Sequence, residues 1–200
     1  MFFPMFCTKT LVNSRSANPI QPLSQNMIDS DRCALQRICE YTASYPLQAN
    51  EIIPRLYVSD MYTATDAPTL ERLQITHVVS VVTDIGTYYP YPPNVKLLHL
   101  PIIDTISSNI ARYFDDAVEW IKNAMDEDES ANVVVHCMCG VSRSPSLVIA
   151  YLMAARGMSL SGSLTHVKAK RRISDPNSGF LDQLADYEQK LMGRAAVAGG

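Results

Sequence analysis

The chain has 200 residues, of which 47% are hydrophobic and 18% are charged, with a formal net charge of −3 at pH 7. This composition suffices for one core of ordinary size, and the small negative charge argues against nucleic acid as a partner. No stretch approaches the roughly 20 apolar residues that a membrane-spanning helix needs. We therefore expect a single soluble domain that does not span a membrane.

The five cysteines are an odd number, and the apolar start of the chain lacks the basic residues of a signal peptide. We interpret the cysteines as reduced thiols and not as a disulfide framework, which predicts a cytoplasmic or nuclear protein. The stretch before Asp29 has no acidic residue but contains Lys9 and Arg15. A transit peptide is therefore the alternative.

The first fifty residues are rich in Ser, Asn, Gln and Pro and show no periodicity. Residues 1–50 are predicted to be a largely disordered N-terminal segment with a possible short helix at 31–41. A folded domain is expected over 51–192, followed by a tail at 193–200.

Strand and helix patterns alternate after this segment. Asp66 and Pro68 mark the start of a short helix through Leu73. Apolar residues recur on one helical face from 110 to 125, and a second helix is expected to include 147–155. Strands are predicted at 52–53, 56–59, 75–82, 95–101 and 133–136. The alternation predicts an α/β fold with a mostly parallel central sheet flanked by helices.

The most informative segment joins the strand that ends at His136 to the next helix. Cys137 opens the connecting loop, six residues before Arg143. Such a loop can turn its backbone N–H groups inward as an anion nest next to a helix N-terminus, which favours a thiolate at Cys137. The planar guanidinium of Arg143 can hold two oxygens of a phosphate group at once.

The sequence from His136 to Ser144, His-Cys-x-x-Gly-x-Ser-Arg-Ser, resembles the signature of the cysteine-dependent protein phosphatases, in the dual-specificity branch. The similarity runs from about Ile52 to about Tyr187. The resemblance implies a phosphotyrosine-phosphatase-like fold with a catalytic domain over 51–192. It also implies hydrolysis of phosphotyrosine and phosphoserine or phosphothreonine in proteins through a phosphocysteine intermediate, without a metal or another cofactor.

The resemblance also assigns roles to residues of the loop. Cys137 would be the nucleophile, and Arg143 would bind the phosphate together with the loop residues Met138, Cys139, Gly140, Val141 and Ser142. The general acid would be Asp104, which follows the strand at 95–101. Asp84, Asp115 and Asp116 are poorer candidates, since the first belongs to another loop and the others lie on a polar helix face. An ordinary turn aspartate is the alternative for Asp104.

Two neighbours of the loop receive supporting roles. The resemblance implies that His136 orients the loop through a hydrogen bond that favours the thiolate, and a simple buried histidine is the alternative. Ser144 could donate a hydrogen bond to the Cys137 sulfur when that sulfur leaves, or could cap the helix. His77, His99 and His166 are interpreted as structural.

Several features leave alternatives open. Cys139 could resolve an oxidised Cys137, whereas a zinc site is disfavoured because no second ligand pair appears at metal spacing. The aromatic stretch 88–93 is either a connection or a docking loop. The basic cluster 168–172 is either a solvated helix face or a basic rim that attracts acidic phosphopeptides.

The loop lacks the extra lysines that the inositol-lipid branch of the resembled superfamily carries there, so the resemblance implies phosphoprotein substrates. The chain is expected to be a monomer. A silent phosphopeptide-binding module and an enzyme of lipid or RNA phosphate are the rival functions.

Overall fold

The computed structural model describes residues 48–83 and 91–198. The helix predicted at 31–41, most of the N-terminal segment, Asp84 and the first residues of the aromatic stretch lie outside these ranges. None of the described helices is both long and apolar enough to cross a membrane.

Five strands form one mixed sheet in the order β1-β2-β5-β3-β4, with β1 antiparallel to β2 and the other neighbours parallel. The mostly parallel central sheet is thus confirmed. Strand β5 contains three consecutive valines. This explains its place in the middle of the sheet, since a strand covered on both faces needs a continuous apolar run. The strands are β1 (Asn50–Ile53), β2 (Leu56–Ser59), β3 (Ile75–Ser80), β4 (Lys96–His99) and β5 (Asn132–His136).

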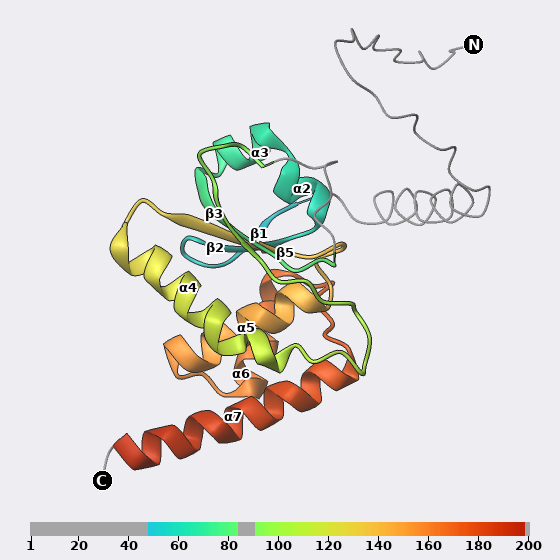
Figure 1. The fold of residues 1–200 in the computed structure, drawn as a ribbon, viewed down its shortest axis with the longest axis vertical. Coiled ribbons are helices and arrows are strands. Elements are labelled where there is room, and N and C mark those ends of the chain that lie inside the picture. Colours follow the sequence, from blue (N-terminus) through green and yellow to red (C-terminus); the bar gives the residue numbers. More distant parts are fainter. Residues whose placement is uncertain (1–47, 84–90, 199–200) are drawn as a thin grey trace, which may run out of the picture. The chain divides into compact units, whose positions relative to one another are not determined.

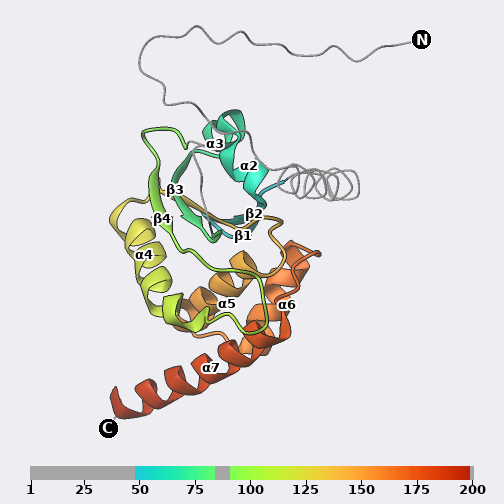
Figure 2. The same cartoon turned by 45° about the vertical axis from the view of Figure 1, so that its right-hand side comes forward.

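Helices cover both faces of the sheet (Figures 1 and 2). The short helices α2 and α3 lie on one face, and α4 to α7 lie on the other, with α5 packed between the sheet and its neighbours. The helices are α2 (Met61–Thr65), α3 (Ala67–Arg72), the 3-10 turn η1 (Ala111–Tyr113), α4 (Phe114–Glu127), α5 (Arg143–Arg156), α6 (Leu160–Lys170) and α7 (Ser178–Ala198).

The main core forms between the sheet and this second layer of helices. Helix α5 is buried on nearly every side from Arg143 to Met153, so it shows little amphipathic pattern. Phe114 of α4 and Phe180 of α7 are fully buried and close the core around it. Each such side chain contributes about 2 kcal/mol or more through burial. The buried helix α5 and the central strand β5 together hold the loop between them.

The boundaries differ from the sequence predictions at a few places. Helix α3 is capped by Asp66, whose carboxylate accepts the Thr69 N–H at 3.1 Å, as its sequence predicts. Helices α2 and α7 were not predicted, and α6 was expected only as the helix face of residues 168–172. Helix α5 begins at Arg143, ahead of the apolar run, directly after the loop that follows β5. Helix α7 continues to Ala198, through most of the stretch expected to be a tail.

Candidate active site

The loop from Cys137 to Ser142 connects the carboxyl end of β5 to the N-terminus of α5. Neighbouring segments fix its backbone. The Met61 N–H donates to the Met138 carbonyl at 3.2 Å, and the Asp175 N–H donates to the Val141 carbonyl at 2.7 Å. The loop is thus held from both the α2 side and the α7 side.

The Cys137 sulfur receives two hydrogen-bond donors. The Gly140 N–H lies 3.2 Å from it and the Ser144 hydroxyl 3.3 Å from it, and the residue is only 1% exposed. Donors of this kind stabilise a negatively charged sulfur. The N-cap position of α5 is occupied by Ser142, so the Ser144 hydroxyl serves the sulfur and not the cap position.

Gly140 permits the loop to turn. Its φ of +66° lies in the left-handed region, and an added Cβ would come within 2.6 Å of the Ser59 carbonyl oxygen. Only glycine accepts this conformation and this close approach without strain.

Arg171 supports the outer side of the same turn. Its guanidinium donates to the Gly140 carbonyl at 2.8 Å and to the Cys139 carbonyl at 3.2 Å, and it also binds the Asn50 side chain at 2.7 Å. Arg171 is only 3% exposed. Both interpretations of the cluster 168–172, a solvated helix face and a basic rim, are therefore wrong for Arg171. The pattern Arg171-Arg172 gives no signal of which arginine points inward.

Arg143 extends from the first turn of α5 towards the loop that carries Asp104. Its Nη1 donates to the Ile102 carbonyl at 3.2 Å, which orients the guanidinium. Its Nε lies 3.4 Å from Asp104 Oδ2, yet this buried nitrogen makes no aligned hydrogen bond. The contact with Asp104 is therefore an ion pair of poor geometry, and Nε can still donate to a phosphate oxygen.

Asp104 lies on the loop after β4, where it meets the catalytic loop. Its Oδ1 accepts the Ser142 hydroxyl at 2.8 Å and the Asn177 side-chain amide at 2.9 Å. The structure thus brings Asp104, Arg143 and Cys137 to one place. Asn177 was missed by the sequence reasoning, although its segment carried part of the resemblance.

Asp115 and Asp116 lie on α4 and do not compete with Asp104. Burial pushes the pKa of Asp115 upward, but hydrogen bonds from Arg194, Lys190 and Tyr187 outweigh this effect and hold it well below its ordinary value. Asp115 therefore ties α4 to α7.

His136 is buried behind the loop. Burial lowers its pKa from 6.5 to about 4, so the ring is neutral at physiological pH. Nδ1 lies 3.2 Å from the Cys137 carbonyl, which only accepts, so the proton is on Nδ1 and Nε2 accepts the Tyr91 hydroxyl. His136 contacts the loop through this carbonyl, and Tyr91, from the aromatic stretch, orients the ring.

The remaining histidines and Cys139 have other surroundings. His99 and His166 each have Nε2 within hydrogen-bonding distance of a backbone carbonyl, and His77 packs edge-on against Trp120. Burial raises the pKa of the Cys139 thiol, and the neighbouring Cys137 raises it further, so Cys139 remains protonated. The Cys137 sulfur, by contrast, receives hydrogen bonds from the Gly140 N–H and the Ser144 hydroxyl.

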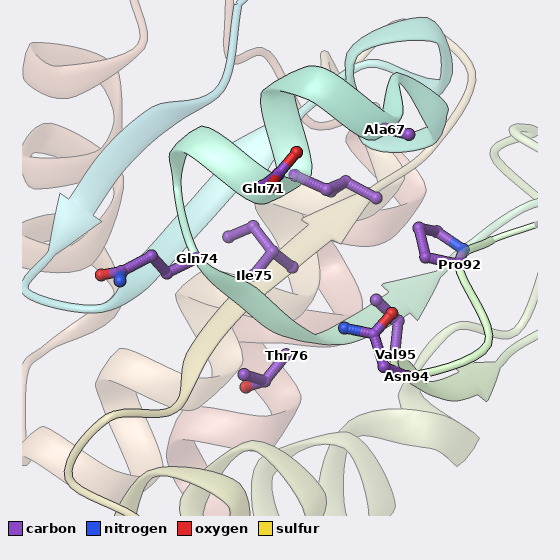
Figure 3. A pocket seen from close by; sticks show the side chains of 9 residues that line it. Ala67, Glu71, Gln74, Ile75, Thr76, Pro92, Asn94 and Val95 are labelled. Atoms are coloured by element: carbon purple, nitrogen blue, oxygen red, sulfur yellow. The ribbon is translucent and has the colours of Figure 1, made fainter.

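A cavity of about 420 Å³ lies at the opposite end of the parallel strands (Figure 3). Glu71 and Ala67 of α3 line it together with Ile75 and Thr76 at the start of β3 and Val95 before β4. The catalytic loop follows the carboxyl ends of the strands, whereas this cavity is at their amino ends. It is therefore separate from the site around Cys137.

The thiol of Cys137 receives two hydrogen bonds at the end of a central strand, and Arg143 in the following helical turn lies beside Asp104 from the loop after β4. This is the arrangement expected of a cysteine-dependent phosphatase. The sequence model described as "Dual specificity phosphatase, catalytic domain" matches residues 56–190. The chain belongs to this family. It is a protein phosphatase that acts on phosphotyrosine and on phosphoserine or phosphothreonine, and its family works through a phosphocysteine intermediate.

Relatives with the same description occur in distant organisms. Dual specificity protein phosphatase 1 of Arabidopsis thaliana is 35% identical over 68% of this chain and 67% of its own length. Dual specificity protein phosphatase 22 of Mus musculus is 38% identical over 70% of this chain and 73% of its own. The crystal structure of human DUSP28 has a TM-score of 0.68 at 28% identity and covers 74% of this chain and 97% of its own.

Proposed function

We propose that this phosphatase cleaves phosphoproteins with Cys137 as the nucleophile, Asp104 as the general acid and Arg143 as the phosphate clamp. The observation that carries the proposal is the pair of donors on a buried sulfur, the Gly140 N–H at 3.2 Å and the Ser144 hydroxyl at 3.3 Å. Cys139, two residues away, has a raised pKa and is the less suitable nucleophile.

In the first step the Cys137 sulfur attacks phosphorus and forms the S–P bond while the P–O bond to the substrate breaks. Asp104 gives its proton to the departing oxygen, which leaves as the hydroxyl group of the substrate. The loop N–H groups and Arg143 hold the three equatorial oxygens. Their stabilisation of transition-state charge is the largest expected contribution, about 10²- to 10³-fold per donor.

In the second step Asp104, now a carboxylate, takes a proton from water as that water attacks phosphorus. The S–P bond breaks, phosphate leaves, and Cys137 returns as the thiolate. Ser144 assists this step by donating a hydrogen bond to the sulfur as negative charge returns to it. His136 positions the loop through the Cys137 carbonyl and does not transfer a proton itself.

Replacement of Cys137 by serine tests the nucleophile. Cys137→Ser is expected to abolish turnover and to retain phosphopeptide binding, because the hydroxyl stays un-ionised while the loop persists.

Arg143→Lys should lower both binding and rate, since an ammonium group cannot match two oxygens. Steady-state kinetics and titration calorimetry measure both effects. Cys137→Ser activity within tenfold of the unaltered enzyme would exclude the proposed nucleophile.

We further propose that the enzyme works as a monomer in the cytoplasm or nucleus. The reduced thiol that the reaction needs supports a reducing compartment. Light scattering at working concentrations tests the first point, and microscopy of the tagged full chain tests the second. A stable dimer, or accumulation in an organelle, would contradict these two proposals.

A further inference from the structure

The loop that carries Asp104 also carries two unusually exposed apolar side chains. Ile106 is 68% exposed and Ile103 is 60% exposed, the highest values among the large hydrophobic side chains of residues 48–83 and 91–198. Isoleucine is commonly buried, so two exposed isoleucines beside a catalytic group suggest a surface that is covered during function.

The exposure does not result from a loosely held loop. The Ser108 N–H donates to the Thr105 carbonyl at 3.1 Å, and Gln183 of α7 donates to the Ser108 carbonyl at 2.9 Å. The backbone at Ile106 packs directly on Gly179, where an added Cβ would lie 1.9 Å from the Ile106 carbonyl oxygen. The main chain is thus fixed while the isoleucine side chains point into solvent.

The position of Asp104 relates these side chains to the substrate. Its carboxylate faces inward to Ser142 and Asn177, and Ile103 and Ile106 lie one and two residues away in the chain. This separation corresponds to at most about 7 Å of extended backbone. In a substrate peptide, the residues within two positions of the phosphorylated residue span the same distance, so they can reach the isoleucines when the phosphate reaches Cys137.

We propose that Ile103 and Ile106 form an aliphatic rim that binds a large apolar side chain within two residues of the phosphorylated residue. This inference rests on the proposed function and specifies its substrates: phosphosites flanked by Leu, Ile, Val, Met or Phe. The catalytic loop between Cys137 and Arg143 contains no charged side chain, so it adds no preference for a charged neighbour. β-branched side chains lose little rotamer freedom on contact, which suits them to this role.

A phosphopeptide series tests the rim. Leucine is placed at each position from −2 to +2 around phosphotyrosine in a serine background, and kcat/KM is compared with the all-serine peptide. The unaltered enzyme should prefer leucine at one or more positions by roughly 5- to 20-fold, the scale of a partly buried aliphatic contact. In the Ile103→Asn, Ile106→Asn double variant this preference should fall to within about twofold.

Two further variants serve as controls. Met192→Asn removes another exposed apolar side chain, on α7 away from Asp104, and should keep the preference. Replacement of both isoleucines by leucine should restore it. The proposal is overturned if the unaltered enzyme shows no preference, or if the asparagine variant retains it. It is equally overturned if the double asparagine variant loses activity in parallel on the leucine peptides, the all-serine peptide and a small aryl phosphate. A change in oligomeric state alone would overturn it as well.

Turnover of the aryl phosphate by the unaltered enzyme distinguishes this inference from the proposed function. An aryl phosphate has no flanking residues, so its hydrolysis needs the catalytic groups Cys137, Arg143 and Asp104 but not the isoleucine rim. If the unaltered enzyme does not hydrolyse the aryl phosphate, the proposed catalytic roles are wrong. If it does so normally but shows no leucine preference, only the proposed isoleucine rim is wrong.

Discussion

The position of the Ser144 hydroxyl predicts that it acts mainly at one step of the two-step reaction. It lies 3.3 Å from the Cys137 sulfur, which also receives the Gly140 N–H. During attack the sulfur loses negative charge, and during breakdown of the intermediate it regains that charge. A donor at this position therefore lowers the barrier of the second step more than that of the first.

Ser144→Ala is expected to slow breakdown of the intermediate selectively. Rapid mixing with a chromogenic aryl phosphate should then show a burst near one equivalent followed by a slow steady rate. Release of the leaving group in a single turnover should remain within a few-fold of the unaltered enzyme. If the burst is absent and both rates fall together, Ser144 acts on thiolate formation or on loop structure instead.

His136 makes the stability of the protein depend on pH. Burial lowers its pKa to about 4 in the folded state, whereas the ordinary value is 6.5. In the unfolded chain His136 therefore binds a proton below about pH 6.5, whereas in the folded chain it binds that proton only below about pH 4. This difference destabilises the fold as the pH falls through that window, by about 2 to 4 kcal/mol in total.

Replacement of His136 by asparagine should reduce this pH dependence. We expect the unfolding free energy of the unaltered protein to fall between pH 7 and pH 5 by about 2 kcal/mol more than that of His136→Asn. Urea unfolding at the two pH values measures the difference, and the carboxyl groups shared by both proteins cancel. An equal loss in the two proteins would mean that folding does not lower the pKa of His136.

At the level of elements, the end of α6 reaches the catalytic loop through Arg171. This side chain binds the Gly140 and Cys139 carbonyls and also Asn50 at the start of β1. Three segments that are distant in the sequence therefore share one buried guanidinium. A lysine has a single ammonium group and cannot reach all these acceptors in one geometry.

Arg171→Lys should lower kcat/KM at least tenfold and reduce the unfolding free energy by about 2 to 4 kcal/mol, because buried carbonyls lose their donors. The adjacent Arg172→Lys is the matched control, since Arg172 is exposed. Enzyme kinetics and urea unfolding of both variants measure these effects. Equal small effects in the two variants would show that Arg171 does not support the loop.

The sequence predicted the elements that carry local patterns. β5 has a run of valines, α4 has an apolar stripe and α3 has its Asp66 cap, and all three were expected. Helix α5 starts at Arg143, four residues before the apolar run at 147 from which it was predicted, because its polar first turn carries no apolar pattern. Helix α7 was missed although its buried residues Phe180, Leu184 and Tyr187 recur at helical spacing. Helix α6 was expected only as the helix face of residues 168–172, because it shows little amphipathic pattern.

At the scale of the whole molecule, parallel strands bring separate loops to one edge of the sheet. Cys137 follows β5, Asp104 follows β4, and Asn177 precedes α7, yet the hydrogen bonds of Asp104 join all three regions. Sequence reasoning could predict Cys137 and Arg143 from their local motif and Asp104 from its place after a strand. It could not predict Asn177, Tyr91 or Arg171, because their partners are distant in the sequence and only the fold brings them together.

Chemical trapping of the intermediate tests the central claim most directly. The Ser144→Ala enzyme is mixed with a radiolabelled phosphopeptide, quenched within milliseconds in denaturant and digested, and the labelled fragment is identified. The predicted result is label approaching one equivalent per enzyme on the fragment that contains Cys137, and no label when Cys137 is also replaced by serine. Label on another residue, or phosphate release during turnover without any protein-bound label, would contradict the mechanism.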